Sequence, residues 1–216
     1  MKKGLTELVF IIDRSGSMHG LEADTLGGFN SMLDKQKNGT GHAYVSTVLF
    51  NDYSEVIHDR ESIKKVKPMT TGDYMVGGCT ALLDAVGGAI KHIGNVHKYA
   101  RKADVPEKTL FVIITDGMEN ASHRYSAERV KDMIKNQQEK YGWEFLFLGA
   151  NIDAVAAANN IGIREDRAVK FCCDEAGTAL NYESIGRAVS SLRECNAIPA
   201  SWKADIERDE KARGRR

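Results

Sequence analysis

The sequence contains few of the residues that mark secreted, fibrous or membrane-embedded chains. Only four cysteines and three prolines occur in 216 residues, which excludes a disulfide scaffold and a proline-rich or collagen-like chain. The longest apolar runs, Leu8–Ile12 and Leu110–Ile114, are far short of the ~18 residues that cross a bilayer. Asp13 interrupts any signal-peptide core, so we expect a cytoplasmic protein with reduced thiols and no membrane partner.

Neither sign of charge predominates. Lys plus Arg and Asp plus Glu both total 30, so the formal net charge is zero. This balance removes the usual electrostatic argument for a nucleic-acid partner. With 42% hydrophobic residues the chain can bury a sizeable core, and its length fits one domain with a small extension. We place the domain at residues 1–196 and expect a charged tail, helical or disordered, at residues 197–216.

Short apolar runs alternate with segments of helical spacing. Continuous rather than alternating hydrophobicity is typical of strands covered on both faces, as in a parallel sheet. The third run follows a turn at Asn51-Asp52, so we expect it to be an antiparallel edge strand. The expected fold is α/β: a doubly wound, Rossmann-like, mostly parallel sheet with one antiparallel edge strand and helices on both faces. The expected strands are Leu8–Ile12, Tyr44–Phe50, Glu55–His58, Leu110–Ile114, Phe145–Leu148 and Val169–Cys173, and the expected helices are Thr80–His97, a segment capped by Ser126, and Leu180–Leu192.

Three loops that should meet at one edge of this sheet carry oxygen donors. In a doubly wound sheet, ligands bind beyond the carboxyl ends of the strands. Asp13, Ser15 and Ser17 lie at the end of the first strand, and Asp116 follows the fourth. Thr80 opens a helix after a Gly-Gly pair that lets its loop approach closely. Two carboxylates and three hydroxyls suit Mg²⁺ or Mn²⁺ rather than zinc, and such an ion favours capture of an acidic side chain from a partner.

The pattern Asp13-x-Ser15-x-Ser17, with distant Thr80 and Asp116, resembles the metal-ion-dependent adhesion site (MIDAS) of von Willebrand factor A (VWA) domains. The likeness covers roughly residues 5–195, and the chain most resembles small intracellular bacterial VWA proteins, some of them associated with tellurium-resistance or stress loci. The resemblance implies that the three hydroxyls lie near the metal and that the two carboxylates bind it directly or through water. It also implies a non-enzymatic, metal-dependent protein-binding role, in which an Asp or Glu of the partner protein is coordinated.

Two other functions stay open at this point. One is metal-assisted hydrolysis, with Glu119 or a loop histidine as the base, although the motifs G-x-G-x-x-G, G-x-x-x-x-G-K-[ST] and G-x-S-x-G do not occur. The other is a structural subunit whose metal only stiffens the loops. Glu119 and Asn120 are also candidates for shaping the rim of the site, and Asp153 for capping a short helix. Trp143 and Trp202 are expected to be packing residues.

Overall fold

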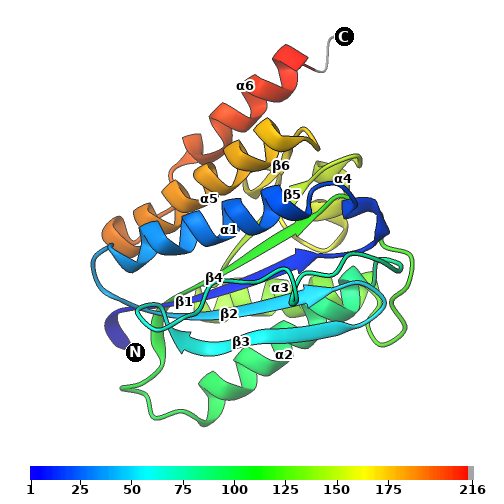
Figure 1. The fold of residues 1–216 in the computed structure, drawn as a ribbon. Coiled ribbons are helices and arrows are strands. Elements are labelled where there is room, and N and C mark those ends of the chain that lie inside the picture. Colours follow the sequence, from blue (N-terminus) through cyan, green and yellow to red (C-terminus); the bar gives the residue numbers. More distant parts are fainter. Residues whose placement is uncertain (214–216) are drawn as a thin grey trace.

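The computed structural model describes residues 1–213 as a six-stranded sheet with helices on both faces (Figure 1). The strand order is β3-β2-β1-β4-β5-β6, and all neighbours are parallel except β2 and β3. The predicted α/β fold with one antiparallel edge strand is therefore confirmed. The strands are β1 (Lys2–Asp13), β2 (His42–Phe50), β3 (Ser54–Ser62), β4 (Pro106–Thr115), β5 (Glu144–Gly149) and β6 (Ala168–Lys170).

The hydrophobic core lies in two layers, one on each face of the sheet. Helices α1 and α5 cover one face, and α2, α3 and α4 cover the other. Neighbouring residues of β1 point into different layers: Phe10 packs with the first group of helices and Ile11 with the second. This explains the continuous apolar runs. The helices are α1 (Glu22–Lys37), α2 (Leu82–Tyr99), α3 (Ala127–Tyr141), α4 (Ala154–Asn160), α5 (Glu175–Cys195) and α6 (Ala204–Arg213).

The three helices expected from their spacing are present as α2, α3 and α5. The side chain of Ser126 accepts the backbone N–H of Arg129 at 3.2 Å, which confirms the predicted cap of α3. The last strand is shorter than predicted, because β6 ends at Lys170 and not at Cys173. The chain turns there, and the carboxylate of Asp174 caps α5 by accepting the N–H of Gly177 at 2.8 Å. Helix α1 has no counterpart in the prediction.

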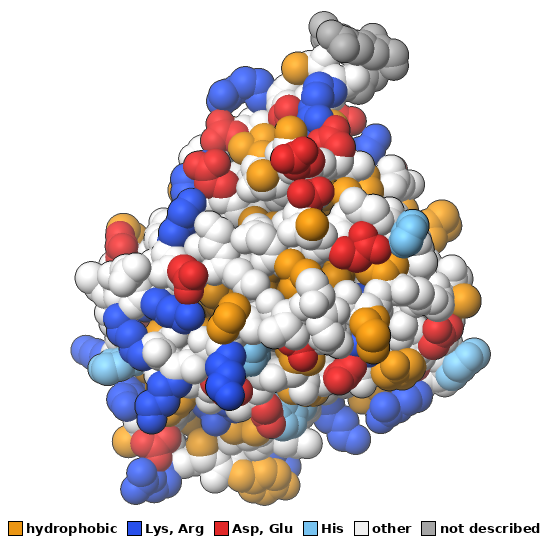
Figure 2. Space-filling model, viewed as in Figure 1, with side chains coloured by type: hydrophobic (Ala, Val, Ile, Leu, Met, Phe, Trp, Pro, Cys, Tyr) orange, Lys and Arg blue, Asp and Glu red, His pale blue; other side chains and the backbone are white. Residues whose placement is uncertain are grey.

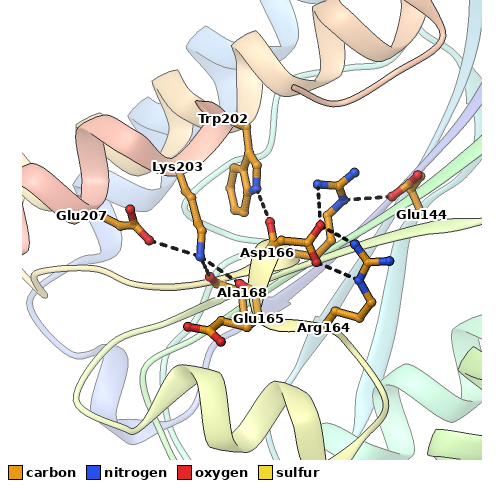
Figure 3. A network of polar contacts seen from close by, with 9 residues as sticks. Glu144, Arg164, Glu165, Asp166, Ala168, Trp202, Lys203 and Glu207 are labelled. Atoms are coloured by element: carbon orange, nitrogen blue, oxygen red, sulfur yellow. Dashed lines mark hydrogen bonds and ion pairs between the residues drawn. The ribbon is translucent and has the colours of Figure 1, made fainter. Parts of the chain in front are cut away.

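The segment 197–213 packs against the open edge of β6 (Figure 3). Trp202 is buried in the core layer of α1 and α5, and its Nε1 donates to the carbonyl of Asp166 at 2.9 Å. Lys203 Nζ donates to the carbonyl of Ala168 in β6 at 2.9 Å and to that of Glu165 in the turn before it at 2.8 Å. The bond to Ala168 covers a backbone acceptor that an edge strand otherwise exposes. That the part up to residue 196 forms a separate domain stays a prediction, and residues 214–216 of the expected tail lie outside the described residues.

Positively and negatively charged side chains are interspersed over the face shown in Figure 2, and the formal net charge of the chain is zero. Within residues 1–213, none of the helices has the length and apolar character needed to span a bilayer. All four cysteines are free. The cytoplasmic location stays a prediction.

Candidate metal centre

The ends of β1 and β4 bring both predicted carboxylates to one edge of the sheet. Asp13 is the last residue of β1, and Asp116 directly follows β4, its parallel neighbour. Oδ1 of Asp13 accepts the backbone N–H of Ser15 at 2.7 Å, and Oδ1 of Asp116 accepts the hydroxyl of Ser17 at 2.5 Å. The hydroxyl oxygens of Ser15 and Ser17 are 3.1 Å apart. Four of the five predicted donors are therefore linked by a chain of short polar contacts.

Thr80, the fifth predicted donor, joins this group from the loop before α2. A methyl group placed on Gly117 would lie 3.0 Å from Thr80 Oγ1 and 3.1 Å from Ser17 Oγ. Ser15 Oγ is 3.9 Å from the same point, so the three hydroxyls converge beside Gly117. The N–H of Thr80 donates to Asn120 Oδ1 at 2.8 Å, and the N–H of Asn120 donates back to the Thr80 carbonyl at 3.1 Å. Asn120 thus fixes the position of Thr80.

Backbone hydrogen bonds hold the Gly-Gly loop against the loop that follows β1. The N–H of Gly16 donates to the carbonyl of Gly78 at 3.0 Å, and the N–H of Gly77 donates to the carbonyl of Arg14 at 2.9 Å. Gly78 has a φ of +80°, and a methyl group on it would collide with the carboxylate of Asp52. Only glycine fits this close approach without strain.

Asp13 and Asp116 are buried carboxylates, and no basic side chain among residues 1–213 forms an ion pair with either of them. Burial raises the pKa of both carboxyl groups, and the charge of Asp116 raises that of Asp13 further. The guanidinium of Arg14, the basic group nearest in sequence, instead contacts Glu55 at 2.7 Å and the carbonyl of Asp73 at 3.1 Å. A bound divalent cation would neutralise this buried negative charge, so the residues present fit a metal held through oxygen.

Three further side chains contact Asp13 or Asp116, and none of them was predicted as part of the site. The hydroxyl of Thr115 donates to Asp13 Oδ2 at 2.6 Å, and the hydroxyl of Tyr74 donates to the Asp13 carbonyl at 2.5 Å. The thiol of Cys173 lies 3.9 Å from Asp116 Oδ2, and burial raises its pKa to about 11. Thr115 and Cys173 were accessible to sequence reasoning because both lie near the carboxyl end of a predicted strand. Tyr74 lies in a long loop that carries no such signal.

The carboxylate of Glu119, the candidate base for hydrolysis, is hydrogen-bonded to the backbone around it. It accepts the backbone N–H groups of Leu83 at 2.8 Å, Ala121 at 3.0 Å and Ser122 at 2.8 Å. Asp153 caps α4 as the sequence suggested. In residues 1–213, no three His, Cys, Asp or Glu side chains form a metal-ligating group. A metal at the site described here would therefore depend on the hydroxyls.

Comparison with solved structures identifies the fold. Proximal thread matrix protein 1 from the mussel byssus, in a structure with a zinc-occupied MIDAS motif, is similar over 86% of this chain, at 18% identity and a TM-score of 0.59. A von Willebrand factor type A structure from Catenulispora acidiphila is similar over 86%, at 14% identity and a TM-score of 0.57. The vWF domain of the type V pili tip protein Mfa5 from Porphyromonas gingivalis is similar over 85%, at 11% identity and a TM-score of 0.56.

These likenesses show that this chain has the fold of VWA domains. The chain spans 46% of the mussel protein and 43% of the Catenulispora chain, so it matches about half the length of each, whereas it spans 94% of the Mfa5 domain. Searches with protein-family models and against curated proteins find no match. The class of protein thus defined is an α/β domain of VWA fold whose MIDAS-like residues lie together at the carboxyl edge of the sheet.

Proposed function

We propose that this protein is a metal-dependent protein-binding module and not an enzyme. One divalent ion, Mg²⁺ or Mn²⁺, would be held by Asp13, Ser15, Ser17, Thr80 and Asp116. When bound, the ion supplies a positive centre for an Asp or Glu side chain of a partner protein. The observation that carries the proposal is the convergence of three hydroxyls on two buried carboxylates that have no basic partner in the described chain. The zinc-occupied MIDAS motif of the mussel protein supports a divalent ion at a site of this kind.

The composition of the site favours binding over hydrolysis. Hydroxyls carry no charge, and Mg²⁺ bound through one or two carboxylates usually retains several waters, so an external carboxylate could take a water position on the ion. A hydrolase also needs a base within reach of an attacking water, and Glu119 is engaged by three backbone N–H groups. We expect neither nucleic acid nor a membrane as the partner. The cytoplasmic location and the likeness to bacterial stress-associated proteins stay predictions.

Thermal unfolding with and without metal tests this function at its first step. Protein stripped with a chelator is melted with and without ~10 mM Mg²⁺ or Mn²⁺. If the metal is present at ten times its dissociation constant, linkage adds roughly 1.4 kcal/mol to the free energy of unfolding. For a chain of this size that is a rise in Tm of about 3–6 °C.

Two variants make this measurement specific. Asp116→Ala should remove the rise, whereas Asp132→Asn, which changes an exposed carboxylate on α3, should keep it. If the wild-type protein shows no rise, the proposed metal centre is wrong. An equal rise in Asp116→Ala would place the ion at another site.

A further inference from the structure

Exposed apolar side chains lie on the three loops next to the candidate metal centre. Tyr53, Met75 and Met118 expose 63%, 69% and 73% of their surfaces, and we call these three residues the apolar rim. Met118 comes two residues after Asp116 in the loop that follows β4. Met75 follows Tyr74, whose hydroxyl bonds the Asp13 carbonyl at 2.5 Å. The apolar rim therefore shares its loops with residues that form or support the candidate centre.

Tyr53 is tied to the centre through the turn between β2 and β3. The N–H of Asn51 donates to the Tyr53 carbonyl at 3.1 Å, and the Asn51 amide donates to the carbonyl of Gly77 at 2.8 Å. The guanidinium of Arg14, one residue from Asp13, lies 5.3 Å from the centre of the Tyr53 ring. Single exposed apolar residues are ordinary, but these three lie on loops that form the candidate centre or hydrogen-bond to it, so a partner bound at the centre would lie beside them.

The charges beside the apolar rim indicate what kind of segment it accepts. Asp13 and Asp116 are buried and negative, and the exposed Asp52 accepts the N–H of Cys79 at 3.2 Å in the loop that carries Thr80. Arg14 is 3% exposed at its side chain and already pairs with Glu55. Without a bound cation this surface repels an acidic segment. A divalent ion would neutralise the two buried carboxylates, and a single external carboxylate could then replace one of the waters that such an ion retains. The complementary occupant is an acidic group with uncharged, apolar neighbours.

We propose that the partner is a protein segment in which the captured Asp or Glu is flanked by aliphatic residues, and that the apolar rim binds these flanking residues. This inference rests on the proposed function. Methionine is unbranched and adaptable, so Met75 and Met118 can contact aliphatic side chains of different shape. Tyr53 adds a rigid ring with a polar tip, a combination that is common where proteins contact one another. The metal centre then selects the carboxylate, and the apolar rim selects the residues beside it.

Three fluorescein-labelled heptapeptides test this inference by fluorescence anisotropy in Mg²⁺ and in a chelator. The first has a central Glu flanked by leucines, the second the same Glu flanked by serines, and the third a Gln flanked by leucines. We expect the leucine-flanked Glu peptide to bind at least fivefold more tightly than the serine-flanked one, and only in Mg²⁺. The ¹³C-methyl signals of Met75 and Met118 should shift with this peptide, and that of Met1, at the other end of β1, should not.

Matched variants separate the apolar rim from the metal centre. Met75→Ser with Met118→Ser should reduce the leucine preference to less than twofold without changing Mn²⁺ binding. Tyr99→Ser with Tyr141→Ser changes two exposed tyrosines at the carboxyl ends of α2 and α3 and should leave the preference intact. A leucine preference that survives in the methionine variant would overturn the inference.

The outcomes also distinguish this inference from the function on which it rests. If both Glu peptides bind equally and only in Mg²⁺, the apolar rim has no role, although capture of a carboxylate stands. If the Glu and Gln peptides bind equally, or no peptide binds to protein loaded with Mg²⁺, the proposed capture of an acidic side chain is wrong. The inference then fails with it.

Discussion

At the scale of single residues, Asp13 and Asp116 should destabilise the metal-free protein at neutral pH. Burial raises the pKa of both above the ordinary value of 3.8, so the folded state binds these protons more tightly than the unfolded state. Stability from a group of this kind is complete below the unfolded pKa and is lost as the pH rises through the folded pKa. A bound divalent cation would reverse this loss.

The first prediction concerns the pH dependence of the metal-free protein. In a chelator, we expect the contribution of Asp13 and Asp116 to the Tm to fall as the pH rises from 3.8 through their raised pKa values. Carboxyl groups with a lowered pKa, such as Asp73, Asp84 and Asp174, act in the opposite direction, so this contribution is measured as the difference in Tm between the wild-type protein and Asp116→Asn. Asp116→Asn should weaken this dependence and give a higher Tm at pH 7 than the wild-type protein, because the amide carries no charge to bury. Thermal melts across the pH range check this. A lower Tm for the variant at pH 7 would contradict it.

Thr115 should act as a positioning residue for Asp13. Its buried hydroxyl donates to Oδ2 of that carboxylate at 2.6 Å, and Thr115→Val removes the bond while nearly keeping the volume. Loss of a hydrogen bond to a charged group corresponds to about 1.5–3 kcal/mol, so the Kd for Mn²⁺ should rise about tenfold or more. Thr109→Val, a buried threonine nearer the start of β4, is the control and should leave the Kd unchanged. Equal Kd values for the wild-type protein, Thr115→Val and Thr109→Val would show that Thr115 does not position Asp13 for metal binding.

At the scale of elements, the Gly-Gly loop decides whether Thr80 reaches the site. Gly78→Ala places a methyl group against Asp52 at a φ of +80°, so we expect the loop to move away and the Kd for Mn²⁺ to rise at least tenfold. Gly88→Ala on α2 meets open space and should leave the Kd unchanged while raising the Tm slightly. Mn²⁺ titrations of both variants measure this. An unchanged Kd for Mn²⁺ in Gly78→Ala would show that metal binding does not need the close approach of the Gly-Gly loop to the site.

The sheet could be predicted from the sequence because its strands are covered on both faces. Such strands read as uninterrupted apolar runs, as Phe10 and Ile11 illustrate by packing into different core layers. Helix α1 was missed because two glycines, and the polar residues Thr25 and Gln36 on its buried face, interrupt its apolar pattern. Gly28 is needed there, since a methyl group on it would collide with the ring of Tyr182 on α5. Close packing between the helices thus outweighs helix propensity in α1.

Some contacts of the candidate site could be predicted from the sequence, and others depend on the three-dimensional path of the chain. The proximity of the five predicted donors could be predicted, because the carboxyl ends of parallel strands meet at one edge of a sheet. The contact of Tyr74 with Asp13 could not be predicted in this way, since it depends on the path of a long loop. The role of Asn120 was visible only as a candidate for the rim, and the structure gives it a defined contact with Thr80.

At the scale of the whole molecule, the carboxyl-terminal segment belongs to the packed structure. Trp202 and Ile206 are buried in the core layer of α1 and α5, and Lys203 donates to the carbonyl of Ala168 in β6 and to that of Glu165 in the turn before it (Figure 3). Ending the chain after residue 196 would expose this edge together with apolar core surface. We therefore expect the segment to limit pairing of β6 with other chains.

Removal of this packing should lower the stability of the whole protein. We expect Trp202→Ala to reduce the free energy of unfolding by about 3–5 kcal/mol, measured by urea denaturation, because a large buried side chain is lost. Arg208→Ala changes an exposed residue of α6 and should have little effect. A chain ended after residue 196 should unfold at lower urea than the full chain and aggregate more readily. Full stability of that shortened chain would contradict this account.

The central claim is that Asp13 and Asp116, with three hydroxyls, hold one divalent ion. Electron paramagnetic resonance of free Mn²⁺ during a titration of the chelator-stripped protein tests this most directly. We predict one Mn²⁺ bound per chain in the wild-type protein and in Asp132→Asn, and none at the same concentration in Asp13→Ala or Asp116→Ala. If the wild-type protein bound no Mn²⁺, or if these two alanine variants bound it as the wild type does, the claim would be contradicted.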